Sequence, residues 1–166
     1  MKPDRLKRFF LPRMTSRRII RLVAVGTAAY ILFGHICIPM RIRGRSMLPT
    51  YSARGVACCW TPAYWFSEPQ RGDVVVIRMA GREVMMLKRV VAVEGDTVAF
   101  RDGVLYVNGE PQKEPYVKHR SREWNLPARK VNEGYIYVVG DNRGMAMEEH
   151  VFGRTSEKRI VGVPLW

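Results

Sequence analysis

"DVVVIRMAGREVMMLKRVVAVEGDTVAFRDGVLYVNG" (residues 73–109) contains four short runs rich in valine, isoleucine, methionine and aromatic residues. Turn signals separate or follow these runs: Ala80-Gly81, Gly95-Asp96, Asp102-Gly103 and Asn108-Gly109. Runs of this composition bounded by such turns are typical of strands, and Asp-Gly and Asn-Gly favour tight hairpins. The stretch therefore predicts a mainly β, mostly antiparallel domain.

The same pattern returns near the C-terminus. "YIYVVG" (135–140) follows Glu133-Gly134, and "RIVGVPLW" (159–166) closes the chain. Between these β-type regions, residues 110–130 are polar, basic and contain proline. We interpret them as a long excursion between strands whose charges face solvent, with contacts to anionic lipid headgroups as the alternative.

An apolar run precedes the β-type region. "LVAVGTAAYILFGHICIPM" (22–40) contains no aspartate, glutamate, lysine or arginine. A helix that crosses a bilayer needs about 20 mainly apolar residues, so this run predicts a transmembrane anchor. A buried helix of a soluble core and a cleaved signal peptide are the alternatives. We prefer an uncleaved anchor, because the run is long for a signal peptide and no clear small-x-small site precedes Arg41.

The charge distribution predicts the orientation of this anchor. The 166-residue chain carries 28 basic and 15 acidic residues, and eight of the basic residues lie within the first 21. Positive charge before a span favours a cytoplasmic N-terminus. We therefore expect a basic cytoplasmic segment (1–21), the anchor (22–40) and an extracytoplasmic domain (41–166). A nucleic-acid-binding role is disfavoured, because the domain lacks a motif of interleaved aromatic and basic residues.

A serine just after the anchor raises the possibility of nucleophilic catalysis. Ser46 lies in "GRSMLPTY" (44–51), and a serine nucleophile needs a base within hydrogen-bond reach. Lys88 is the candidate base, because strand alternation places it on one face with Met86 and Val90. Apolar surroundings lower the pKa of a lysine, which lets it accept a proton. The alternative is an edge-strand lysine whose ammonium reaches solvent.

The cysteines and the metal-binding residue types add little. Cys37, Cys58 and Cys59 are interpreted as small apolar residues, since Cys37 lies in the expected span and the other two are adjacent. No spacing typical of a zinc site occurs. We expect neither a metal nor another cofactor.

Together these segments resemble the type I signal peptidase family of membrane-anchored Ser–Lys proteases. The resemblance rests on "SMLPT" (46–50), "RGDVVV" (71–76), "KRVVAVEGD" (88–96), "GDNR" (140–143) and "FG" (152–153). It implies a β-rich catalytic domain in which Ser46 is the nucleophile and Lys88 the general base. It also implies that Met47 packs beside the nucleophile and that Asp141 and Asn142 hold the last loop in place. We expect Asp73, Arg89 and Asp96 to form ion pairs or turn bonds rather than take part in the chemistry.

The sequence departs from this family at several positions. Ala146 stands where a serine commonly bonds the catalytic lysine. Glu148 keeps the acid that follows, and His150 replaces an arginine, so we expect any ion pair between them to be weak and pH-dependent. Gly44 stands where some members carry a hydroxyl that stabilises the oxyanion. The Ser46 N–H would then carry more of that task.

The resemblance implies removal of signal peptides from exported preproteins, with small residues before the cut. The lipid bilayer is the other expected partner, and the oligomeric state is not predicted. The alternatives are a specialised relative that processes pilins or a few dedicated substrates, and a catalytically weak module that binds signal peptides. A self-cleaving repressor is disfavoured, because residues 22–40 leave no room for a DNA-binding domain. The expected location is the bacterial plasma membrane, with the mitochondrial inner membrane as the alternative.

Overall fold

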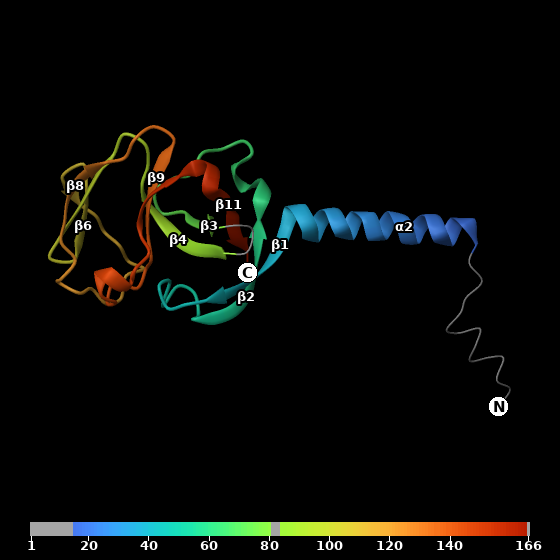
Figure 1. Ribbon diagram of the computed structural model, residues 1–166, viewed down its shortest axis with the longest axis horizontal. Coiled ribbons are helices and arrows are strands. Elements are labelled where there is room, and N and C mark those ends of the chain that lie inside the picture. The colour runs from blue at the N-terminus through green and yellow to red at the C-terminus, as the bar shows by residue number, and fades with distance from the viewer. Residues whose placement is uncertain (1–14, 81–83, 166) are drawn as a thin grey trace, which may run out of the picture.

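The computed structural model of the chain describes residues 15–80 and 84–165. Most of the predicted basic segment, the predicted turn residue Gly81 and the final residue lie outside the described residues. One helical segment leads into a β domain with two sheets (Figure 1). The larger sheet lies next to the helix, and the smaller sheet lies at the far end of the molecule.

The strands follow one another along most of the described chain. In order they are β1 (Cys37–Arg43), β2 (Arg54–Trp60), β3 (Val74–Ala80), β4 (Val84–Ala92), β5 (Thr97–Arg101), β6 (Val104–Val107), β7 (Glu110–Pro111), β8 (Leu126–Lys130), β9 (Tyr135–Val139), β10 (Gly153–Ser156) and β11 (Ile160–Leu165). Single turns lie between them: η2 (Thr61–Tyr64), η3 (Met147–Glu149) and η4 (Glu157–Arg159). Every strand pair is antiparallel, which confirms the predicted mainly β class.

The larger sheet carries the segments that the motifs occupy. Its order is β1-β2-β11-β3-β4-β9-β10, so β1 lies at one edge and β4 lies inside. The β4–β9 pairing begins at Arg89, while β3 pairs with β4 from Val84 to Arg89. One side of β4 from Met85 to Leu87 is therefore not covered by β9.

The smaller sheet has the order β7-β6-β5-β8. Asp102 and Gly103 both have positive φ in the β5–β6 turn, as a tight hairpin turn requires. The prediction that residues 110–130 form only an excursion is wrong in part, because β8 pairs with β5. Pro127 lies in β8, and a proline is tolerated there because β8 is an edge strand.

The helical segment consists of α2 (Ser16–Ile31) and η1 (Leu32–Ile36). It is long and apolar enough to cross a membrane, and none of its apolar window is buried against the domain. The structure therefore does not support the alternative of a buried core helix. The helix also starts before the predicted span of 22–40, and the last four residues of that span belong to β1.

The expectation for the cysteines is wrong for two of them. Cys37 and Cys58 form a disulfide with a Cα–Cα distance of 5.6 Å. Cys37 does not lie in the helix but at the start of β1, where pairing of β1 with β2 brings it beside Cys58. Cys59 is free and buried, as expected of a small apolar residue.

Candidate active site

Ser46 lies in the loop that joins β1 to β2, three residues after β1 ends. Met47 and Tyr51 anchor this loop, because both are buried in a cluster with Met40, Ala57, Cys59, Val76 and Leu87. Gly44 has a φ of +117°, which residues with a side chain rarely adopt. Any residue with a side chain, a serine included, would be strained at position 44 in this backbone. Ser46 itself is half-buried.

The loop after β9 holds the Ser46 loop from the other side. The N–H of Asn142 donates to the Ser46 carbonyl oxygen at 2.9 Å, and its Nδ2 donates to the Arg45 carbonyl oxygen at 3.0 Å. Gly140 permits this approach, since a Cβ there would collide with the Ser46 carbonyl oxygen. Two segments far apart in the sequence are thus joined at Ser46.

Asp141 connects the same loop to β4. It is fully buried and accepts two hydrogen bonds from Arg89, at 2.8 and 2.6 Å. Thr50 donates a further bond of 2.5 Å to its carboxylate. The guanidinium of Arg89 also donates to the Gly72 carbonyl oxygen and lies 3.9 Å from the ring centroid of Tyr116. Arg89 therefore forms the kind of supporting ion pair that the sequence predicts.

Lys88 precedes Arg89 in β4 and pairs with Val75 of β3. Only 3% of Lys88 is exposed, so it is not a lysine whose ammonium reaches solvent. Burial lowers its pKa from 10.5 to about 8, and the nearby charge of Asp141 opposes this shift. Lys88 forms no ion pair with any residue in the described ranges. A large fraction of Lys88 side chains is therefore neutral only slightly above neutral pH.

The loop of residues 140–143 lies beside both predicted catalytic residues. Asn142 bonds the backbone of Ser46, and Asp141 interacts electrostatically with Lys88. Among the described residues, Ser46 and Lys88 make no direct hydrogen bond to each other. Catalytic hydrogen bonds commonly tighten only when substrate binds.

A small groove lies between the open edge of β1 and the uncovered part of β4. Its volume is about 60 Å³, and Ser46 and Met47 are among its lining residues. The other lining residues are Met40, Arg41, Ile42, Arg43, Gly44, Met85, Met86 and Leu87. Unpaired backbone on both sides of a groove can bind an extended peptide by β-augmentation.

His150 replaces the expected arginine and behaves differently from the prediction. It is 6% exposed, and its Nε2–H donates to the Asn142 carbonyl oxygen at 2.7 Å. Burial lowers its pKa to about 4; the hydrogen bond to the Asn142 carbonyl oxygen opposes this shift, while the charges of Lys88 and Arg143 add to it. Glu148 is exposed and forms no ion pair with any described residue. No ion pair therefore forms between Glu148 and His150, and His150 bonds the backbone instead.

A second buried ion pair was not predicted. Arg143 donates to Glu114 at 2.7 Å, and both side chains are 1% exposed. Arg143 Nε also donates to the Gly140 carbonyl oxygen at 2.7 Å, which fixes the turn before Asp141. Arg143 belongs to the "GDNR" motif, but no pattern marks Glu114 as buried. No group of three or more metal-ligating side chains occurs within residues 15–80 and 84–165.

Comparison with known proteins identifies the family of the chain. Residues 15–165 match the family described as signal peptidase, peptidase S26. A probable signal peptidase I-1 from Synechocystis is 32% identical over 153 residues, which cover 87% of this chain and 77% of the relative. Signal peptidase I V from Bacillus subtilis is 31% identical, over 95% of this chain and 96% of the relative. A crystal structure of a signal peptidase I from Enterococcus faecalis, 26% identical, matches 58% of this chain and 97% of its own with a TM-score of 0.49.

The β-rich fold and the family match define a serine peptidase. The chain belongs to the signal peptidase family, peptidase S26.

Proposed function

We propose that the chain is a membrane-anchored endopeptidase that removes N-terminal signal peptides from exported preproteins with a Ser46–Lys88 dyad. The observation that carries this proposal is a lysine that is 3% exposed, has a pKa of about 8 and lies beside the loop that binds the Ser46 backbone. The relatives named signal peptidase I support the substrate class.

Neutral Lys88 takes the proton of the Ser46 hydroxyl, whose oxygen attacks the scissile carbonyl carbon. The tetrahedral intermediate collapses to an ester of Ser46, and Lys88 gives its proton to the leaving amine. Neutral Lys88 then takes a proton from water, whose oxygen attacks the ester carbon. Lys88 returns this proton to the Ser46 oxygen as the ester bond breaks, which restores both residues. The burial of Lys88 supports this scheme, because a lysine with an ordinary pKa would be almost wholly protonated at neutral pH.

The groove supports the choice of an extended substrate with small side chains. We propose that the segment before the cut runs between β1 and β4 and pairs with their free backbone groups. The groove is only about 60 Å³ in volume, and this favours alanine-sized residues at the first and third positions before the cut. Successive strand residues face opposite sides, so these two positions face the same way.

The supporting residues have distinct proposed tasks. The Ser46 N–H has no acceptor among the described residues and is available to the oxyanion. Gly44 has no side chain, so the space two residues before Ser46 stays free for the substrate. Met47 packs below the nucleophile, while Asp141 and Asn142 hold β4 and the Ser46 loop together. Glu148 is exposed, so we propose no catalytic task for it.

The anchor places this chemistry at a membrane. We propose that α2 and η1 cross the bilayer, with the basic N-terminal segment in the cytoplasm and the β domain outside. Thr61 donates to the His35 carbonyl oxygen at 2.6 Å, so η2 adjoins the end of the helix, and the nearby Trp60, Trp65 and Phe66 are exposed as expected at a lipid interface. The Cys37–Cys58 disulfide supports an oxidising compartment outside the cytoplasm. A bacterial plasma membrane fits these features, with the mitochondrial inner membrane as the alternative.

The test uses the full chain in detergent and a preprotein with an Ala-x-Ala site. We expect one cut after the second alanine, mapped by mass spectrometry, and no cut by Ser46→Ala. Ser52→Ala, a serine of the same loop, is the matched control and should remain active. A chain that binds the preprotein without cutting it would favour the binding-module alternative.

A further inference from the structure

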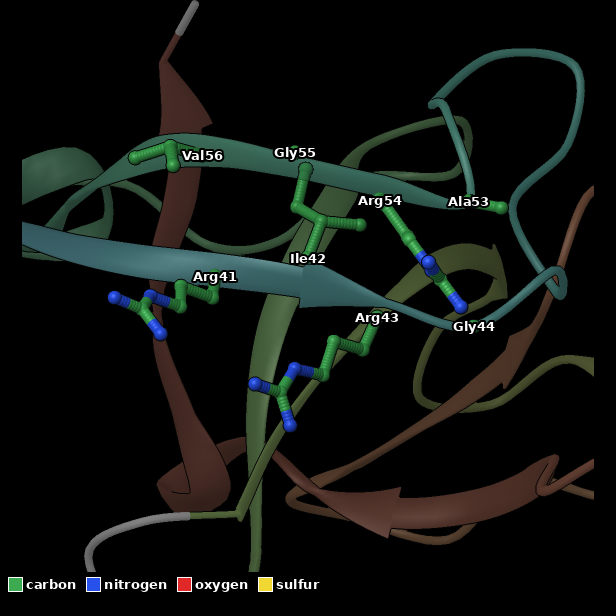
Figure 2. Close-up of a pocket in the computed structure, with 8 residues that line it drawn as sticks. All are labelled: Arg41, Ile42, Arg43, Gly44, Ala53, Arg54, Gly55 and Val56. Atoms are coloured by element: carbon green, nitrogen blue, oxygen red, sulfur yellow. The ribbon is translucent and has the colours of Figure 1, made fainter.

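Three arginines lie together at the end of the β1–β2 hairpin. Arg41, Arg43 and Arg54 are exposed and line a surface hollow of about 780 Å³, together with Ile42, Gly44, Ala53, Gly55 and Val56 (Figure 2). No acidic residue lines the hollow, and none of the three arginines forms an ion pair with a described residue. The hollow is therefore a site of uncompensated positive charge.

Arg41 and Arg43 belong to β1 and line the small groove as well as the hollow, but strand alternation turns their side chains away from the core side of β1. Met40 is buried in the core beneath β1, and Ile42 packs against the same cluster. Arg41 and Arg43 alternate with Met40 and Ile42 along β1, so their side chains point away from the core. Figure 2 shows Arg41 and Arg43 on the side of β1 opposite to Ile42. In the hairpin register Arg43 is paired with Arg54, so the three guanidinium groups share one face.

The orientation of a bound substrate strand rests on the proposed function. A substrate strand beside the free edge of β1 would place its first and third residues before the cut toward the groove. Its second and fourth residues would then face the opposite side, which is the side of Arg41 and Arg43. Residues directly opposite on neighbouring strands have Cβ atoms about 5 Å apart, so these side chains would meet the arginines.

We infer that Arg41 and Arg43 select substrates with an acidic side chain at the second position before the cut and disfavour lysine or arginine there. Arg54 lies one strand further from the substrate and contributes less. An exposed ion pair stabilises a complex only weakly, so we expect roughly a threefold preference per charge step. High salt should weaken the preference, because exposed charges are screened.

The experiment compares three preprotein peptides that differ only at the second position before the cut, with glutamate, glutamine or lysine. The full chain in neutral detergent cleaves them at low and at high salt, and kcat/KM is compared within each variant. The variants are Arg41→Gln with Arg43→Gln, Arg54→Gln, and Arg129→Gln. Arg129 is an exposed arginine of the smaller sheet and serves as the control for the change in net charge.

We expect wild type to prefer glutamate over glutamine and glutamine over lysine, with both ratios falling at high salt. The double variant should lose the preference, Arg54→Gln should keep most of it, and Arg129→Gln should keep all of it. Equal cleavage of the three peptides, or a double variant that retains the preference, overturns this inference but leaves the proposed function intact. A double variant that loses binding to vesicles of anionic phospholipid while its peptide preference is unchanged also overturns the inference, because the arginines would then bind lipid. A wild type that cuts none of the peptides overturns the proposed function, and the inference with it.

Discussion

The N–H of Asn142 donates to the carbonyl oxygen of Ser46 at 2.9 Å. The carbonyl oxygen of Asn142 in turn accepts the Nε2–H of His150 at 2.7 Å. The buried His150 thus fixes Asn142, and Asn142 in turn fixes the Ser46 loop. This chain of bonds makes His150 a positioning residue in the proposed mechanism rather than a catalytic one.

Replacement of His150 tests this positioning role. Phenylalanine keeps the ring but cannot donate to the Asn142 carbonyl oxygen, whereas the amide of glutamine can. We expect His150→Phe to lower kcat by about tenfold, because a buried carbonyl would lose its partner, and His150→Gln to lower it less. KM should change less than kcat in both variants. His119→Phe, at an exposed histidine, is the control. Full kcat in His150→Phe would contradict the positioning role.

Gly140 tests the close approach of the two loops. A Cβ at this position would collide with the Ser46 carbonyl oxygen and lie 2.9 Å from His150 Cε1. Overpacking of this kind costs on the order of 1–3 kcal/mol, so we expect Gly140→Ala to lower both Tm and activity. Gly26→Ala is the control, because an added Cβ there has no neighbour within 4 Å. Wild-type values of Tm and kcat/KM in Gly140→Ala would show that the loops are not in tight contact.

Lys88 should destabilise the folded state at neutral pH. Its pKa is about 8 when folded and 10.5 in the reference state, so the unfolded chain binds the extra proton below pH 10.5. The penalty is complete below about pH 8, on the order of 3 kcal/mol, and it disappears as the pH rises through 10.5. We therefore expect Lys88→Met to be inactive but to have a higher Tm at pH 7. Lys113→Met, at an exposed lysine, should leave Tm unchanged. A Tm for Lys88→Met below that of wild type at pH 7 would contradict the lowered pKa of Lys88 in the folded state.

Local patterns were sufficient for much of the fold. The runs that became β3, β4, β5, β6, β9 and β11 are rich in β-forming residues, and glycine-containing turns separate most of them. β1 could not be recognised, because its first residues continue the apolar run of the anchor without a break. β2 and β8 gain their stability from pairing with strands distant in sequence, which no local pattern records.

The burial of Lys88 was predictable from the sequence, but many contacts of the candidate site were not. Apolar residues surround Lys88 in the sequence, and burial follows from that pattern, whereas its proposed role as a base depends on the family resemblance. The bond from His150 to Asn142 could not be predicted, because it depends on how η3 turns the chain back toward the loop after β9. The disulfide of Cys37 likewise depends on the strand register between β1 and β2.

The most direct test of the Ser46–Lys88 dyad is the pH dependence of kcat/KM for preprotein cleavage by wild type and Lys88→Ala. We expect wild-type kcat/KM to rise with pH through a single group with a pKa of about 8, because only neutral Lys88 can accept the Ser46 proton. We expect Lys88→Ala to be inactive across the range. A Lys88→Ala chain that cleaves with the wild-type pH profile would show that Lys88 is not the general base.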